Sequence, residues 1–455
     1  MAAPNWLWAK SAGSAGWDYA GLDYGSSTIS TDQKGKSYIT GSFKGPAVFG
    51  SINLTSPTYP AIFVAKYNTN GTCLWAKRFG GNDTADIYGN KGESIDIDPA
   101  GNCYVTGTFK GSLGSTITLA PGITLTGTGH RQIFIVKYSP AGNPIWAKQP
   151  DGTAANNYTR SISVGFLGEC YITGYLGATG VKFGSTAALT APGAFIAKYD
   201  TNGNALWATK IGAGNCDPMS IEIDAGSSSF ITGFFQNTET INGTTYTSIG
   251  SRDTFIASVD SNGVFKWFKH FGFAGNDSWG RGISTDIYGN IFITGYFNKK
   301  IVFGGTTLNV TGMGNREAFI VKLNNNGNPV WAKQSTNSNN TNGVSIKALP
   351  TGQCFVTGFY SGSSSVSFTG NQILSNGKMY VFVAKYGTNG SLIWIQKSGD
   401  GIINAAENPL GISYDANLNI YIAGNSQGPS KFGTNILTAY GGYDAFIAKL
   451  EFICP

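Results

Sequence analysis

Polar side chains recur at one equivalent position of short segments such as SIDID, which repeat along the chain. Their neighbours are mostly Ile, Val or Thr, and in a β-strand this alternation turns the polar residues to one side. The set is Ser30, Asp96, Ser163, Glu222, Ser284, Lys347 and Ser413. Asp96 and Glu222 could bind a small ligand or a cation. The alternative is a polar network with water, because buried polar groups need hydrogen-bond partners.

A carboxylate pair is also the machinery of glycoside hydrolysis, which needs the two groups about 5 to 9.5 Å apart. Asp96 and Glu222 belong to repeats that are not neighbours, so the sequence favours a protein that is not an enzyme. It contains no G-x-S-x-G motif, zinc spacing or phosphate loop, and His130 and His270 stand in unrelated places. DPAGN and DIYGN lack the twelfth-position acid of a calcium loop. We therefore expect no cofactor, and a structural calcium ion has no support.

Aromatic residues beside amides, acids and arginines form a second candidate site in segments of variable length, such as GNDSWGRG. The candidate ligand-binding residues are Trp17, Asp18, Tyr19, Tyr88, Glu93, Tyr158, Arg160, Asp277, Trp279 and Arg281. An exposed ring can cover the apolar face of a sugar while polar neighbours bond its hydroxyl groups. The alternative is that the rings fill gaps between structural units and the Asp and Asn residues cap turns.

The elements that must position these residues come from an internal repeat. Residues 194–210 read AFIAKYDTNGNALWATK, and in every complete copy a tryptophan follows the phenylalanine by 12 residues. The phenylalanines are 60 to 71 residues apart. They are Phe63, Phe134, Phe195, Phe255, Phe319, Phe382 and Phe446. Self-similarity at such a period is typical of solenoids and propellers.

Each repeat is predicted to form four short strands, rich in Ile, Val, Tyr, Phe and Thr and without helical periodicity. Asn-Gly and Gly-Asn pairs supply the positive φ angles of tight hairpins. A longer irregular segment with a weak FG…LT pattern precedes the third strand. We expect an all-β chain in which residues 1–455 form a single seven-bladed β-propeller of four-stranded antiparallel blades. The polar set would then surround its central channel.

The two ends of the chain carry complementary halves of the motif. WLWAK near the N-terminus can only be a fourth strand, and AFIAKL near the C-terminus can only be a third strand. The closing blade is therefore predicted to be shared between the N-terminal outer strand and the C-terminal strands, which removes a free edge. The segments that vary in length all fall on one face. We expect the binding site on that face, because binding residues gather in loops.

These residues resemble the bacterial SBBP repeat, a family named for seven-bladed β-propellers. The resemblance rests on FGGNDTAD at residues 79–86, on DPAGNCYVTG at residues 98–107, and on FGFAGNDSWG followed by DIYGNIFITG. It covers nearly the whole chain and implies the propeller fold. It also implies a secreted or surface bacterial protein, but a fold does not supply chemistry.

Composition and cysteine placement limit which partners the protein can bind and in which compartment it can reside. The net charge is +6, and many lysines occupy fixed positions that are spread evenly over the repeats. Because a nucleic-acid binder gathers its charge on one face, we expect no nucleic-acid partner. No apolar run approaches the roughly 18 residues of a membrane helix. MAAPNWLWAK is no signal peptide, so we expect a secreted or cell-surface domain whose signal has been removed, with a cytoplasmic protein as the alternative. Cys73, Cys216 and Cys454 could form disulfides.

The function predicted from these observations is binding or adhesion by a lectin-like, non-enzymatic propeller that recognises a glycan or protein on the face with variable loops. One alternative is a structural spacer or assembly module of a larger multidomain adhesin or filament. A second alternative is a glycan-active enzyme with its site at the central channel.

Overall fold

The structure is a computed structural model of the 455-residue chain. It describes residues 3–14, 27–81, 89–152, 156–190, 192–311, 316–336, 340–361, 365–369, 371–375, 378–398, 407–427, 429–438 and 442–451. The regular elements in these ranges are all strands, which confirms the prediction of an all-β chain. Among them there is accordingly no helix with the length and hydrophobicity needed to cross a membrane.

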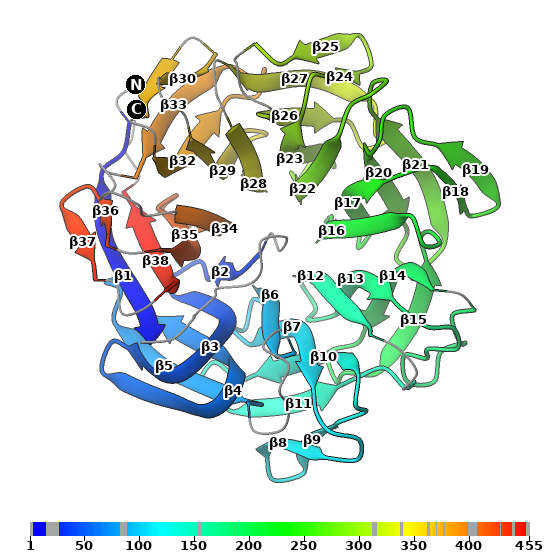
Figure 1. Cartoon of the computed structure of the whole chain (residues 1–455), viewed down its shortest axis with the longest axis vertical. Helices are drawn as coiled ribbons and strands as arrows, with labels where there is room; N and C mark the ends of the chain where they lie inside the picture. The colour runs from blue at the N-terminus through cyan, green and yellow to red at the C-terminus, as the bar shows by residue number, and fades with distance from the viewer. Residues whose placement is uncertain are drawn as a thin grey trace.

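Each repeat contributes four strands that pair antiparallel in the order first, second, third, fourth. Figure 1 shows these groups standing in a ring, with the first strands nearest the common axis. The first strands are β2 (Ile29–Thr31), β6 (Lys91–Ile97), β12 (Tyr158–Val164), β16 (Cys216–Ile223), β22 (Ser278–Thr285), β28 (Asn340–Ala348) and β34 (Glu407–Tyr414). The second strands are β3 (Ser37–Phe49), β7 (Cys103–Lys110), β13 (Cys170–Leu176), β17 (Ser229–Phe235), β23 (Ile291–Phe297), β29 (Cys354–Ser361) and β35 (Ile420–Ser426).

The third and fourth strands carry the AFIAK and LWATK halves of the repeated motif. The third strands are β4 (Ile52–Tyr67), β10 (Arg131–Tyr138), β14 (Gly193–Tyr199), β20 (Asp253–Val259), β26 (Glu317–Leu323), β32 (Met379–Tyr386) and β38 (Asp444–Leu450). The fourth strands are β5 (Cys73–Phe79), β11 (Pro144–Lys148), β15 (Ala205–Lys210), β21 (Phe265–Phe271), β27 (Pro329–Thr336), β33 (Leu392–Lys397) and β1 (Trp6–Ser14).

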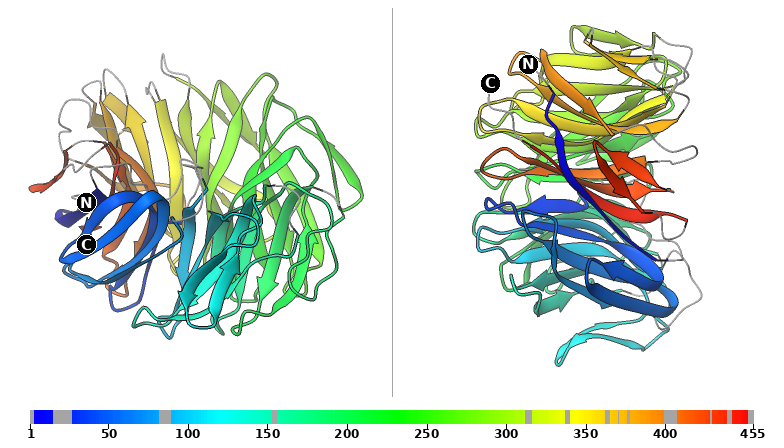
Figure 2. Two further views of the ribbon diagram at one scale, coloured as in Figure 1. Left: turned by 60° about the horizontal axis from the view of Figure 1, so that its bottom comes forward. Right: turned by 90° about the vertical axis from the view of Figure 1, so that its left-hand side faces the viewer.

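The N-terminal strand β1 pairs with the C-terminal strand β38, which gives the sheet order β34-β35-β38-β1. Trp8 lies opposite Lys449 and Ala12 opposite Ala445 in this antiparallel ladder. The far end of β1 then pairs with β3, where Gly13 lies opposite Val48. Figure 2 shows dark-blue β1 running beside red β38 at the edge of the ring. Strands from opposite ends of the sequence therefore form one sheet.

The segment between the second and third strands is more regular than the sequence indicated. In most repeats it folds into a two-stranded ribbon. The ribbons are β8 (Thr116–Ala120) with β9 (Ile123–Thr126), β18 (Thr238–Ile241) with β19 (Thr244–Thr247), β24 (Lys300–Phe303) with β25 (Thr306–Asn309), β30 (Ser365–Phe368) with β31 (Asn371–Leu374), and β36 (Ser430–Phe432) with β37 (Asn435–Leu437). In the ribbons that contain β24, β30 and β36 a phenylalanine is buried against the marker phenylalanine, as in Phe303–Phe319 at 5.1 Å and Phe432–Phe446 at 5.0 Å between ring centroids.

The repeated motif joins each group of strands to the next. Trp146 Nε1 donates to the backbone oxygen of Thr201 in the following repeat at 3.0 Å, and Lys137 Nζ donates to the same oxygen at 3.2 Å. Gly203 in that turn packs on the indole so closely that a Cβ would lie 2.8 Å from the ring. The same tryptophan contact recurs as Trp8 to Thr69, Trp75 to Pro140, Trp207 to Ser261 and Trp331 to Thr388. The motif therefore recurs with the same residues and spacing because its tryptophan and glycine pack against neighbouring repeats.

The hydrophobic core lies between the faces of neighbouring sheets. One cluster brings Tyr104 and Trp146 of one repeat against Ile172 and Phe195 of the next. Every sheet therefore needs its neighbours to bury its apolar faces, as expected of stacked repeats.

The described cysteines are free thiols that take part in this packing. Cys73, Cys103, Cys170, Cys216 and Cys354 are all buried. Burial raises the pKa of each thiol, to about 12 for Cys73, which makes these groups poor nucleophiles. Cys73 and Cys216 form no disulfide with another described residue. Cys454 lies outside the described residues.

Candidate functional site

The central polar set lines a cavity of about 670 Å³ at the axis of the ring. Six of its members contribute to the wall, whereas Ser163 is buried beside it. The wall also contains the turns at residues 32–36, 98–101 and 165–166, which connect first and second strands. The cavity therefore opens on the face of uniform tight turns and not on the face with variable loops, which the sequence did not predict.

Asp96 accepts hydrogen bonds from three repeats in this wall. Its Oδ1 accepts from Ser30 Oγ and from the backbone nitrogen of Ile97, both at 2.9 Å. Its Oδ2 accepts from the backbone nitrogen of Val164 at 2.9 Å. Asp96 thus connects the innermost strands β2, β6 and β12.

Glu222 of β16 and Lys347 of β28 form an ion pair near the axis, on either side of β22. Lys347 Nζ lies 3.2 and 3.3 Å from the two carboxylate oxygens of Glu222, and Ser284 Oγ donates to one of them at 3.4 Å. Burial raises the pKa of Glu222, Lys347 opposes the shift, and the charge of Asp96 adds to it. Burial disfavours the Lys347 ammonium, but Glu222 and Asp96 outweigh burial and raise its pKa. Asp96 and Glu222 come from repeats that are not neighbours and still interact, because the innermost strands converge at the axis.

The variable-loop face brings together a different group of residues. Tyr158 and Arg160 lie on β12, where the Arg160 guanidinium stands 4.6 Å from the centre of the Tyr158 ring. Tyr158 stacks on Tyr175 with the ring centroids 5.4 Å apart. Arg160 forms an ion pair of 3.2 Å with Asp217 of the next repeat.

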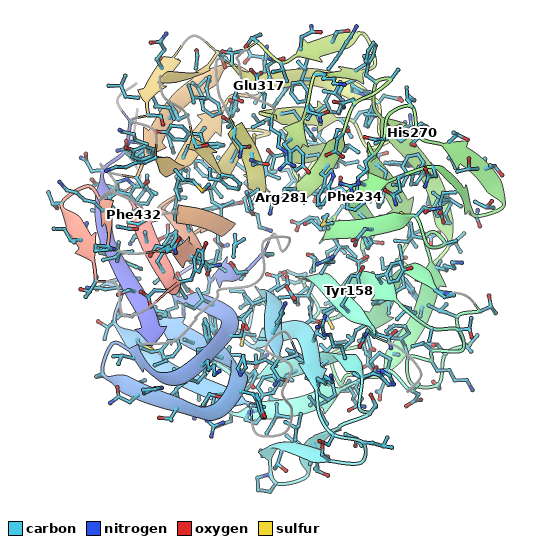
Figure 3. All side chains as sticks on the ribbon, viewed as in Figure 1. Tyr158, Phe234, His270, Arg281, Glu317 and Phe432 are labelled. Carbon is cyan, nitrogen blue, oxygen red and sulfur yellow. The ribbon has the colours of Figure 1, made fainter. Side chains whose placement is uncertain are left out.

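The strand β22 extends this group through Asp277, Trp279 and Arg281. Trp279 donates from Nε1 to Asp277 at 3.2 Å and stacks on Phe234 of the preceding repeat, with ring centroids 4.2 Å apart. Tyr296 lies 5.6 Å from Trp279 between ring centroids. Figure 3 labels Tyr158, Phe234 and Arg281 at the inner side of the ring. The repeat that contains Phe234 and the repeat that contains Trp279 therefore share one aromatic surface.

Two further arginines lie on these rings. Arg252 stands 5.1 Å from the centre of Trp279 and 5.2 Å from that of Phe234, and it pairs with Asp277 at 3.6 Å. Arg316 stands 4.5 Å from the centre of Tyr296. We call the following set the arginine–aromatic arc: Tyr158, Tyr175, Phe234, Trp279 and Tyr296 with Arg160, Arg252, Arg281 and Arg316.

The electrostatics of Tyr296 show that the charges of the arc act on one another. Burial and the charge of Asp277 raise the pKa of Tyr296 above its usual value. The charges of Arg316, Arg281 and Arg252 all oppose that shift. Three guanidinium groups are therefore gathered near this ring.

β-Bulges in the first strands set the direction of some of these side chains. The strand register shifts at Glu93, Arg160 and Arg281, which lie at equivalent positions of β6, β12 and β22. A β-bulge of this kind bends the strand and redirects the side chain of the extra residue. Glu93 is buried, and its charge helps to raise the pKa of Arg160.

Sequence reasoning missed several members of the arc. Tyr175, Phe234 and Tyr296 directly follow the glycine of the YITG-like motif, while Arg252 and Arg316 precede the marker phenylalanine by three residues. The sequence signal that could have identified these residues is that they occupy equivalent positions in their repeats.

The remaining candidate residues and His270 lie apart from the arc or outside the described residues. Trp17, Asp18, Tyr19 and Tyr88 lie outside the described residues. His270, labelled in Figure 3, lies with its Nδ1 2.8 Å from the buried Asp253 carboxylate, a contact that the sequence did not indicate. Within the described ranges, no three His, Cys, Asp or Glu residues are grouped as metal ligands would be.

Comparison with known proteins supports the repeat type. The family described as "Beta-propeller repeat" (SBBP) matches residues 266–296. An uncharacterized WD repeat-containing protein of Acanthamoeba polyphaga mimivirus is 31% identical over 209 residues, which are 39% of this chain. The matched part is only 14% of the length of that viral protein. The chain is thus an all-β protein with repeats of the β-propeller type.

Solved structures show only distant likeness. A protein of unknown function from Dyadobacter fermentans is 9% identical, with a TM-score of 0.42 and 100% of both chains covered. An ulvan lyase is 10% identical, with a TM-score of 0.45, over 90% of this chain and 92% of its own. A gluconolactonase from Xanthomonas campestris is 10% identical, with a TM-score of 0.33, over 77% of this chain and 90% of its own. Likenesses this distant say nothing about the chemistry of the chain.

Proposed function

We propose that residues 1–455 form a single seven-bladed β-propeller that binds a glycan on its variable-loop face, as a non-enzymatic adhesion protein of the bacterial surface or exterior. In this proposal β34, β35, β38 and β1 make the closing blade. The pairing of β1 with β38 supports the closed ring. The stack of Phe234 on Trp279 beneath Arg252 carries the functional part.

The exposure of the arc favours a ligand over a purely structural role for its rings. Tyr158, Tyr175, Phe234 and Trp279 are only partly buried, whereas Tyr104, which fills a gap between sheets, is fully buried. The partly buried Trp75 and Trp207 differ from the rings of the arc because each donates its indole N–H to the following repeat. Partly exposed rings held in place by stacking form a rigid platform, and rigidity lowers the entropic cost of binding. Asp277 and Arg252 beside the platform supply an acceptor and donors for hydroxyl groups.

Glycan-array screening followed by calorimetric titration with the best glycan tests the proposal. Trp279→Ala should weaken binding at least tenfold, which corresponds to about 1.4 kcal/mol. Tyr288→Ala is the matched control, because Tyr288 is 70% exposed in a tight turn on the opposite face. Equal affinity of the wild type and the Trp279 variant, or an equal loss in the control, would contradict the assignment.

A glycan-active enzyme at the central channel is the alternative that the cavity favours. Asp96 and Glu222 would be its carboxylates, but both are held by donors of the protein itself, as in a network that joins blades. Incubation with polysaccharides should therefore release no new chain ends. Cleavage that disappears in Glu222→Gln would establish the enzyme instead.

A further inference from the structure

We infer that the glycan recognised by the arginine–aromatic arc is anionic and carries carboxylate or sulfate groups. This inference rests on the proposed function and specifies the ligand of the same site. Its basis is the placement, exposure and stacking of the arginines.

Arginine is scarce in the chain and is concentrated near the variable loops. Of the 31 basic residues only six are arginines. They are Arg78, Arg131, Arg160, Arg252, Arg281 and Arg316. All lie in the parts of strands, or immediately before strands, that adjoin the variable-loop face. The basic residues that line the cavity on the opposite face are instead all lysines. Arginine is therefore confined to the variable-loop face, whereas lysine occurs on both faces, as Lys91 and Lys110 show.

The charge that the arc presents to solvent is positive. Its carboxylates are Glu93, Asp217 and Asp277; Glu93 is 2% exposed, and the other two side chains are 19% and 18% exposed. By contrast, 38% of the Arg252 side chain is exposed, and Arg316 is an exposed residue. Arg160 and Arg281 are more deeply placed, with 12% of the Arg160 side chain and 5% of Arg281 exposed, so Arg252 and Arg316 are the guanidinium groups that an approaching ligand meets first.

Arg252 is oriented to accept an oxyanion. Its Nε donates to Gln236 at 3.4 Å and its Nη1 pairs with Asp277, while within the described ranges Nη2 makes no further polar contact. The rings of Trp279 and Phe234, whose centres lie 5.1 and 5.2 Å away, restrain the guanidinium together with Gln236 and Asp277. A planar fork of N–H donors matches carboxylate and sulfate oxygens. A sugar ring on the aromatic platform would place such a substituent beside this guanidinium.

Binding to matched anionic and neutral glycans tests the inference by calorimetry. The first pair is oligogalacturonate and its fully methyl-esterified form, and the second is a sulfated galactan and its desulfated form. The anionic member of at least one pair should bind at least tenfold more tightly, and its affinity should fall as salt rises from 50 to about 200 mM because charges are screened. The pair that shows the difference identifies carboxylate or sulfate as the recognised group.

Variants of Arg252 distinguish specific recognition of an anionic glycan from nonspecific attraction to a positively charged protein. Arg252→Gln should lose at least tenfold for the anionic glycan and distinctly less for the neutral one, because glutamine keeps an N–H donor for hydroxyl groups but has no charge. Arg252→Lys should also bind the anionic glycan more weakly, because lysine lacks the bidentate fork. Lys34→Gln, an exposed cation on the opposite face, is the matched control and should change neither affinity. Unchanged circular dichroism and melting would show that the variants fold.

The outcomes distinguish this inference from the proposed function. If the neutral members bind as tightly as the anionic ones, the ligand is not selected by charge, and the glycan-binding function remains. If Lys34→Gln weakens binding as much as Arg252→Gln, the attraction is nonspecific and the inference is wrong. If no glycan of either kind binds, the proposed function itself fails.

Discussion

Replacing Trp146 tests the contact that joins neighbouring repeats. Its side chain is 8% exposed, its Nε1 donates to Thr201, and Gly203 packs on the indole. A buried tryptophan removes about 150 to 250 Å² from water, which at about 25 cal/mol per Å² gives an upper value of about 4 to 6 kcal/mol. Since cavities relax partly, we expect Trp146→Ala to lower the free energy of unfolding by about 4 kcal/mol.

Trp146→Phe separates packing from the hydrogen bond. The phenyl ring keeps much of the apolar contact but removes the indole donor, which is worth about 1 kcal/mol. Together with the smaller ring, the loss should be about 2 kcal/mol. Urea unfolding followed by far-ultraviolet circular dichroism measures both variants, and an unchanged dependence on urea would show that the extent of unfolding is the same.

Ile145→Ala is the matched control, because Ile145 lies next to Trp146 in β11 but is 46% exposed. Its loss should stay within about 0.5 to 1 kcal/mol. A loss in the control as large as that in Trp146→Ala would refute the reasoning. So would a Trp146→Ala protein within about 1 kcal/mol of the wild type, because the contact would then add little to the joining of repeats.

Three further measurements follow from the same packing and from the central ion pair. Trp8→Ala should also lower the free energy of unfolding by about 4 kcal/mol, because its indole N–H donates to Thr69 and so joins the sheet that contains β1 and β38 to the first repeat. A loss under about 1 kcal/mol in the urea assay would argue against a closed ring. Gly142→Ala should destabilise more than Gly114→Ala: their φ angles are 82° and 77°, but a Cβ would lie 2.7 Å from Trp75 at the first position and meet nothing within 4 Å at the second. Equal melting temperatures of the two variants would contradict the contact. Because burial raises the pKa of Glu222 above 4.5, the folded protein holds more protons than the unfolded chain just above that pH, so the free energy of unfolding should fall with rising pH in the wild type relative to Glu222→Gln. Parallel stability curves from pH 4 to 7 would exclude this linkage.

Much of the fold could be predicted because it depends on residues that recur. The 12-residue interval from Phe195 to Trp207 spans a hairpin, and Gly203 in its turn adopts φ of 79°, as Asn-Gly turns require. The ribbons were harder to predict, since strands of four residues such as β24 carry too few residues to show alternation. Some of them, such as the ribbon of β24, are stabilised by a long-range ring contact, which local sequence does not reveal.

The candidate site was predictable only in its individual residues. Trp279 and Arg281 were selected because aromatic and charged residues stand in a segment of variable length. Their partners Phe234 and Arg252 belong to the preceding repeat, more than 25 residues away, and no spacing within one repeat indicates the contact. Packing between sheets decided which rings stack, and hence which arginine they orient.

By itself, the sequence determined the four main strands of each repeat and their hairpin turns, because turns and strand alternation are local properties. The tertiary structure alone decided that the ribbons form, that Glu222 meets Lys347 near the axis and that the central cavity opens among the tight turns. The ion pair and the cavity depend on how far the first strands converge around the ring. Convergence is set by the packing of whole sheets against each other, which no single segment of the chain encodes.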